Sequence, residues 1–137
     1  MHSNMVYQKS LKNGLISLKK EKTANFTMIM TLQILHYEFL GPIKLNEWGP
    51  PMGKVVYVIL SRDKDFFNII YIDQSEKTNA TDFFTKHKQF KCWITHAGSE
   101  KNLYLSIHPM EDSDEKDRQK LVNKALESYK PVCNMED

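Results

Sequence analysis

The chain has 137 residues, of which 41% are hydrophobic and 26% charged, and its formal net charge is +2. This length and apolar fraction suit one domain with a single core, and two cysteines exclude a disulfide-dense scaffold. No apolar run approaches the roughly 20 residues that a membrane-spanning helix needs. The charge is unevenly spread, since residues 1–30 hold five lysines and one glutamate, and residues 31–137 hold 14 basic and 16 acidic residues. A basic segment of net +4 therefore precedes a slightly acidic body.

Residues 1–30 are rich in Lys, Ser, Asn and Gln, a composition that favours a basic, loosely ordered extension. A nucleic-acid-binding arm is one alternative. Another is that the natural protein begins at Met28 or Met30, directly before a strand pattern. Lysines interrupt any apolar stretch long enough for a secretory signal, so we expect a cytoplasmic protein.

The body begins with a predicted strand over Thr31–Leu40, where Leu35, Tyr37 and Phe39 alternate with the residues between them. Gly41-Pro42 is expected to end this strand. Residues 41–53 are rich in Pro and Gly, which predicts a loop with Trp48 as its packing anchor.

A hairpin is predicted next. Residues 54–60 are β-branched and apolar on both faces, which is typical of a central strand. A polar turn over residues 61–68 separates it from a second strand over residues 69–72, so the two strands are expected to pair antiparallel.

The remaining elements are short. We expect a helix from Asn79 or Thr81 to Lys88, followed by strands over residues 91–95 and 103–107. The acidic run at residues 111–115 predicts a helix start with Asp112 or Ser113 as its cap, and Pro131 ends that helix. The order of elements over residues 31–137 predicts one small α+β domain with a mainly antiparallel sheet flanked by helices.

Four features in chain order carry a resemblance to a known family: Val56-Tyr57-Val58, Tyr71-Ile72-Asp73-Gln74-Ser75, His87, and the ending Tyr129-Lys130-Pro131-Val132-Cys133-Asn134. From Tyr57 to Asn134 the chain resembles the GIY-YIG nuclease family. In that family two short motifs lie on a hairpin, an Arg follows on a helix, a metal-binding Glu lies on a later helix, and an Asn follows a Pro.

The resemblance implies a site for phosphodiester hydrolysis, which needs a base, a cation and a metal held by carboxylate. It makes Tyr57, Tyr71 and His87 the candidate catalytic residues. Mg²⁺ or Mn²⁺ is the implied cofactor if nuclease activity is retained.

The chain departs from the family at two positions. The Arg position falls near Thr81, and counting back nine residues from Pro131 puts the metal-binding Glu position on Val122. We therefore expect an impaired nuclease site with no metal ligand assigned. Two alternatives stay open: an active endonuclease that uses Asp73 or Asp82 or a site completed by a partner, and a protein-interaction module that keeps only the fold. If Val122 points away from Tyr57 and Tyr71, this alignment of the motifs is wrong.

A positive patch predicts contact with DNA or RNA. Lys86, Lys88 and Lys91 lie in a stretch without acidic residues, and Trp93 offers an aromatic ring for base stacking. Asn134 joins this predicted interface through the resemblance. The same lysines are equally compatible with a solvated helix end, where basic side chains favour the dipole.

Two cysteines and two histidines suggest zinc at first sight: Cys92, His96, His108 and Cys133. The Cys-x₃-His spacing is not typical of zinc fingers and no second close pair supports it, so buried structural cysteines are the simpler expectation. A disulfide between Cys92 and Cys133 stays open as an alternative without support, because nothing in the sequence indicates secretion.

Overall fold

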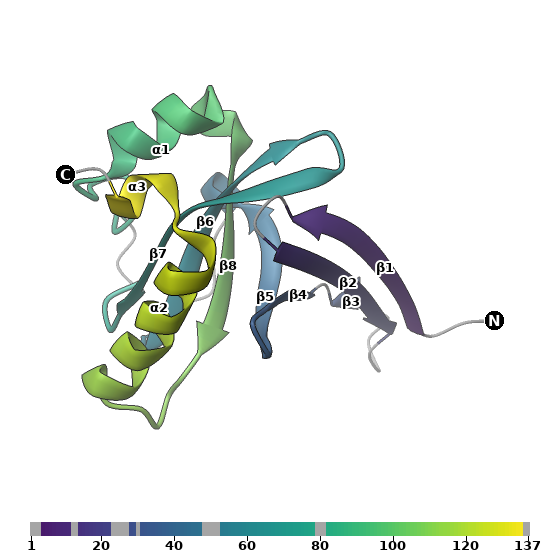
Figure 1. The fold of residues 1–137 in the computed structure, drawn as a ribbon, viewed down its shortest axis with the longest axis horizontal. Coiled ribbons are helices and arrows are strands. Elements are labelled where there is room, and N and C mark those ends of the chain that lie inside the picture. Colours follow the sequence, from purple (N-terminus) through teal and green to yellow (C-terminus); the bar gives the residue numbers. More distant parts are fainter. Residues whose placement is uncertain are drawn as a thin grey trace.

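The computed structural model describes residues 4–11, 14–22, 28–29, 31–47, 53–78 and 82–135. It is a small α+β fold, in which a curled sheet carries three α-helices among the described residues (Figure 1). The helices are α1 (Phe90–Ala97), α2 (Glu115–Tyr129) and α3 (Val132–Met135). None of them is long and apolar enough to span a membrane.

The strands are β1 (Asn4–Leu11), β2 (Gly14–Lys22), β3 (Met28–Ile29), β4 (Thr31–Ile34), β5 (Tyr37–Lys44), β6 (Val55–Asp63), β7 (Phe66–Ser75) and β8 (Leu103–Pro109). Their order in the sheet is β3-β2-β1-β7-β6-β8-β5-β4. The five strands β7-β6-β8-β5-β4 pair antiparallel throughout. Strand β1 joins this body in parallel at the Leu11–Phe67 pair.

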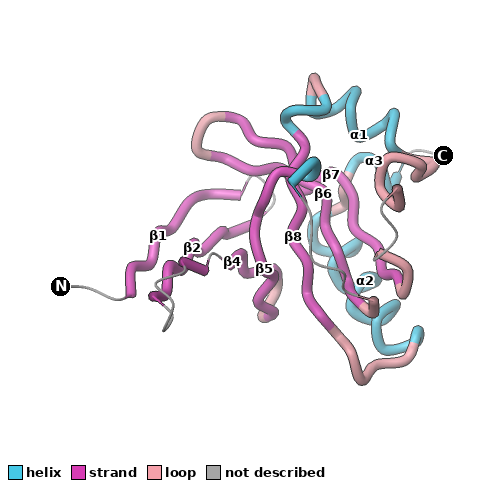
Figure 2. Tube along the Cα trace, turned by 180° about the vertical axis from the view of Figure 1, so that it is seen from behind, coloured by secondary structure: helices cyan, strands magenta, loops and turns pink. Residues whose placement is uncertain are grey.

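Strand β6 lies inside the sheet, between β7 and β8, and separates two cores. Val56, Val58 and Leu60 face one core, which α2 covers. Val55, Tyr57 and Ile59 face the other core, to which α1 contributes Trp93. Residues 55–60 are buried because both faces of the strand are covered, as their continuous apolar sequence predicts. Viewed from behind, α1 and α3 lie together near one end of the strands (Figure 2).

The predicted strand over Thr31–Leu40 is wrong, because the chain reverses within it. Strands β4 and β5 form an antiparallel hairpin whose turn is Leu35-His36. Leu35 takes φ +58°, a conformation that an apolar residue rarely adopts and that no local glycine announces.

Gly41-Pro42 does not end the strand as expected, and β5 continues to Lys44. A bulge lies here, since the pairing with β8 shifts between Leu40 and Ile43. The bulge accommodates the proline, which cannot donate to a ladder. Gly41 has φ +105°, and a Cβ at this position would lie 2.8 Å from the Leu105 carbonyl oxygen. The predicted loop is therefore partly strand, and Trp48 falls outside the described residues.

The predicted strand over residues 91–95 is also wrong, since these residues belong to α1. The described part of the helix predicted before it, residues 82–88, forms turns instead, and Asn79 and Thr81 lie outside the described residues. Phe90, Trp93, Ile94 and Ala97 have the i, i+3, i+4, i+7 spacing of a helix face and pack on the second core. Gly98 closes α1 in the left-handed conformation, and its N–H donates to the Ile94 carbonyl.

Three other predictions are confirmed with adjusted bounds. The hairpin is β6–β7, but its turn is only Lys64-Asp65, so both strands are longer than expected. Residues 103–107 lie in β8. The terminal helix is α2, although its cap is Asp114, whose side chain accepts from the Asp117 N–H at 2.9 Å.

Strands β1, β2 and β3 lie within residues 1–30, the segment that the sequence assigns to a basic extension. The boundary between an extension and a domain at residue 30 stays a prediction.

Candidate functional site

The structure brings the side chains of Tyr57, Tyr71 and His87 into one cluster, which we call the tyrosine cluster. The Tyr57 hydroxyl lies 3.3 Å from Nε2 of His87. The ring centroids of Tyr71 and His87 are 5.2 Å apart in an edge-to-face arrangement, and those of the two tyrosines are 6.3 Å apart. The resemblance grouped these three residues, and they are indeed neighbours in space.

Strand register explains how β6 and β7 present the two tyrosines together. Tyr57 of β6 pairs with Asp73 of β7, while Tyr71 pairs with Ile59. A bulge then follows, because the pairing shifts between Ile59 and Leu60. The bulge lets Ile70 and Tyr71, which are consecutive, both join the core on the α1 side.

Hydrogen bonds fix the protonation pattern of His87. The Gln89 N–H donates to Nδ1 of His87 at 3.0 Å, so this nitrogen carries no proton in the neutral ring. The proton then resides on Nε2, which donates to the Tyr57 hydroxyl oxygen. The Tyr71 hydroxyl donates to Oδ2 of Asp73 at 3.1 Å.

The surroundings hold the cluster in its neutral forms. Burial, followed by the nearby Asp73 charge, raises the pKa of Tyr57 and of Tyr71 far above the ordinary value for tyrosine. Burial lowers the pKa of His87. At neutral pH the cluster therefore presents two phenols and a neutral imidazole whose Nδ1 is already occupied. Neither tyrosine is poised to act as a phenolate base.

Two residues expected at a nucleic-acid interface have structural roles instead. Trp93 is fully buried, with its ring 4.7 Å from the His87 ring, so a nucleobase cannot stack on it in this conformation. Asn134 accepts from the Ile72 N–H and donates to the Ile72 carbonyl, both at 2.9 Å. The Asn134 amide thus bonds both backbone groups of one β7 residue, as a residue of a neighbouring strand would.

The three predicted lysines are all exposed. Lys86 forms an ion pair at 2.9 Å with Asp82, which lies four residues earlier in the chain. Lys88 and Lys91 flank the start of α1, directly after His87. The segment that carries His87 into the tyrosine cluster therefore also carries the exposed positive charge.

Val122 does not lie in the tyrosine cluster. It is buried in the core beneath α2, with Val56 and Val58, whereas Tyr57 and Tyr71 belong to the core on the other face of β6. The motif alignment that places the family's metal-binding Glu on Val122 is therefore wrong. Of the two alternative carboxylates, Asp73 contacts Tyr71 and Asp82 is exposed beside Lys86.

Sequence reasoning missed Arg118, whose side chain is fully buried in α2. Its Nε donates to Oε1 of Gln74 at 3.0 Å, and its Nη1 donates to the carbonyl and the hydroxyl of Ser113. These bonds tie α2 to the end of β7. The charged stretch around Arg118 looks solvated in the sequence, so no signal there marks a buried guanidinium.

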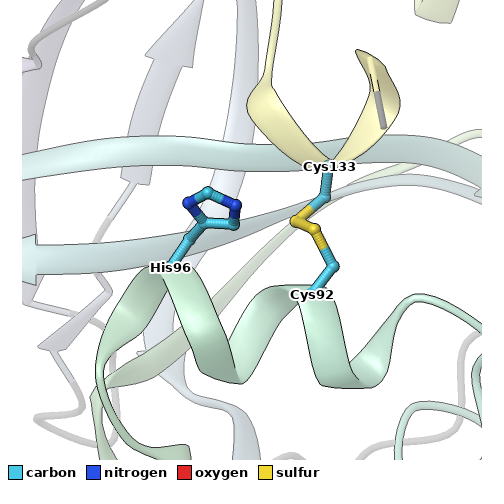
Figure 3. A group of neighbouring side chains, drawn as sticks. All are labelled: Cys92, His96 and Cys133. Carbon is cyan, nitrogen blue, oxygen red and sulfur yellow. A yellow bond between two sulfur atoms is a disulfide. The ribbon is translucent and has the colours of Figure 1, made fainter. Parts of the chain in front are cut away.

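A second group of side chains lies where α1 meets α3. Cys92 and Cys133 form a disulfide with their Cα atoms 6.0 Å apart, the pairing that the sequence leaves open without support. His96 lies beside the bridge, as Figure 3 shows. His108 is elsewhere, with Nδ1 at 2.8 Å from the Glu38 carbonyl oxygen.

Comparisons of the chain with protein-family models, with curated proteins and with solved structures find no match. The resemblance to the GIY-YIG family therefore rests on the residues described above.

Proposed function

We propose that the chain is a GIY-YIG-like domain with an impaired nuclease site, which binds DNA or RNA through Lys86, Lys88 and Lys91. The observation that supports this proposal is that one segment, residues 82–91, carries both His87 and the three lysines. It delivers His87 to the tyrosine cluster and, next to it, three exposed lysines with a single acidic residue, Asp82, among them.

The charges of this segment decide which lysines matter most. Asp82 neutralises part of the Lys86 charge, because the two groups are in contact. Lys88 and Lys91 have no acidic neighbour in the sequence between Phe83 and Ser99. Phosphate contact by such lysines gives binding that depends on salt and little on sequence.

The chemistry of the tyrosine cluster supports an impaired nuclease site. Hydrolysis needs a base for water, and the raised pKa values keep both tyrosines protonated.

The position of Asp73 beside Tyr71 favours the alternative of an active, metal-dependent endonuclease. Its carboxylate contacts Tyr71 and could hold Mg²⁺ or Mn²⁺ together with a substrate phosphate. A single carboxylate binds Mg²⁺ weakly on its own, so we rank this alternative second.

The test measures binding and cleavage on the same substrates: labelled single-stranded, duplex and branched DNA, and RNA, with Mg²⁺ or Mn²⁺. The binding variant is Lys88→Glu with Lys91→Glu. Its matched control is Lys116→Glu with Lys124→Glu, which makes the same charge change at exposed positions of α2. A second control, Lys19→Gln with Lys20→Gln, removes charge from the basic N-terminal segment.

We expect binding without cleavage, and an affinity at least about tenfold lower in the binding variant than in either control. Metal-dependent cleavage that Tyr71→Phe abolishes would contradict impairment and support the endonuclease. A protein that binds none of these nucleic acids would instead be an interaction module. If the Lys19 and Lys20 control loses the affinity, the N-terminal segment is the binding arm.

A further inference from the structure

The group formed by Cys92, His96 and Cys133 has the composition and spacing of a metal site. Cys92 and His96 lie one turn apart on the same face of α1, and α3 supplies Cys133 (Figure 3). The two sulfur atoms and one imidazole nitrogen all lie within 4.8 Å of one another. Two helices that are close only in the folded chain therefore place three zinc-type ligands together.

The distances suit a tetrahedral centre. Zinc bonds to thiolate at about 2.3 Å and to imidazole at about 2.0–2.1 Å, so two of its ligand atoms lie about 3.3–3.8 Å apart. The Cα atoms of Cys92 and Cys133 are 6.0 Å apart, so we expect side-chain rotation to bring the three atoms to this separation once the bond between the sulfurs is reduced.

We propose that the reduced protein binds one zinc ion through Cys92, His96 and Cys133, and that the disulfide is the metal-free, oxidised form of the same site. Thiolate and imidazole together select zinc over the harder cations Mg²⁺ and Ca²⁺. The proposal does not depend on nucleic-acid binding, since these residues lie outside the tyrosine cluster.

The group supplies three ligands from the described residues, so a tetrahedral zinc ion would take its fourth ligand from outside the group. His96 is exposed, and it borders a surface hollow of about 240 Å³ that Ser61, Asn68 and Lys130 also line. Water that reaches His96 from this side is the candidate fourth ligand. Lys130 adds positive charge to the hollow, so a small anion is the natural competitor for the water.

Burial assigns the two cysteines different parts in the redox step. Cys92 is half-buried and Cys133 is fully buried. The Cys92 thiolate attacks a small-molecule disulfide and releases one of its thiolates. Cys133 then displaces the second thiolate from the mixed disulfide. The two protein thiolates are oxidised, the external disulfide is reduced to two thiolates, and the zinc ion is released.

The test titrates the full-length protein, reduced with a phosphine, with Co²⁺ and then with Zn²⁺. We expect one ion per chain and a thiolate-to-cobalt charge-transfer absorption that zinc abolishes. The deciding variant is His96→Gln, because it leaves both cysteines in place, and its matched control is His108→Gln. Loss of an outer partner of a ligand alone weakens zinc binding by about 10–100-fold, so we expect His96→Gln to weaken it by more than about 100-fold.

Oxidation with a small-molecule disulfide should release the zinc and give a Cys92-to-Cys133 linkage by mass spectrometry. The proposal is overturned if the reduced protein shows no charge-transfer absorption. It is also overturned if His96→Gln binds zinc as tightly as His108→Gln, or if the oxidised protein retains the metal. Cys92→Ser with Cys133→Ser should remove both the absorption and the linkage, and the histidine pair decides the matter if this variant does not fold.

Discussion

The hydrogen bonds of Asn134 predict that its removal weakens the fold, although the residue lies in a four-residue helix near the end of the described chain. Asn134→Ala deletes two hydrogen bonds of 2.9 Å to the backbone of Ile72, whose side chain is 1% accessible. Each such bond contributes about 0.5–1.5 kcal/mol, and a buried group left unpaired costs about 1–3 kcal/mol. Because Asn134 is half-buried and water can replace part of its amide, we expect a loss of about 2–3 kcal/mol in the free energy of unfolding.

Urea unfolding of the oxidised protein, followed by circular dichroism, measures this loss. With an m-value of about 1.5–2 kcal/mol/M, the midpoint should fall by about 1–2 M while the slope stays unchanged. The control is Asn123→Ala, which removes an exposed amide whose oxygen accepts from the Gln119 side chain on α2, and it should stay within about 0.5 kcal/mol of the parent. Equal stability of the two variants would refute the role of Asn134 as a partner of β7.

Two further predictions concern Val122 and His87. Val122→Glu restores the family's residue type at the counted position, but it buries a carboxylate in the apolar core under α2. It should cost at least about 3 kcal/mol in a urea melt and confer no Mg²⁺-dependent cleavage, and a folded, cleaving variant would contradict this. Burial lowers the pKa of His87, so the unfolded state binds a proton more readily and the free energy of unfolding should fall as the pH drops below about 6.5. His87→Gln should flatten this dependence, and an NMR titration that places the pKa of His87 at or above 6.5 would contradict it.

The central hairpin was predictable because its signal is local. An apolar run with β-branched residues, a polar turn and a second apolar run determine β6 and β7 without help from distant contacts. The hairpin of β4 and β5 gave no such signal, since Leu35-His36 contains none of the residues that usually mark a turn. The surrounding core, to which Leu32, Ile34 and Phe39 all contribute, holds that turn in place.

Helix α1 shows that the predicted secondary structure depends on how many residues are considered together. Over residues 91–95 the apolar side chains suggest a strand, whereas over Phe90–Ala97 they follow one helix face. The mistake also removed the spatial argument for the cysteine and histidine group, which the sequence names but sets aside. Four residues span about 13 Å along a strand but only about 6 Å along a helix, so Cys92 and His96 become neighbours only in α1.

The tyrosine cluster was predictable from the resemblance, but its chemical state was not. The order of the motifs grouped Tyr57, Tyr71 and His87, and strand register then explains their contact. The neutral forms depend on burial and on Asp73, which no pattern in the chain reveals. Burial likewise turns Trp93 from an expected stacking surface into a support for His87.

The central claim is that Lys88 and Lys91 contact phosphates, and the salt dependence of binding tests it most directly. For single-stranded nucleic acid, each phosphate contact contributes about −0.7 to the slope of log affinity against log salt. The Lys88→Glu, Lys91→Glu variant should therefore show a slope shallower by about 1.4 than the parent, and the Lys116→Glu, Lys124→Glu control should match the parent. An unchanged slope in the first variant, or an equal change in the control, would contradict the claim.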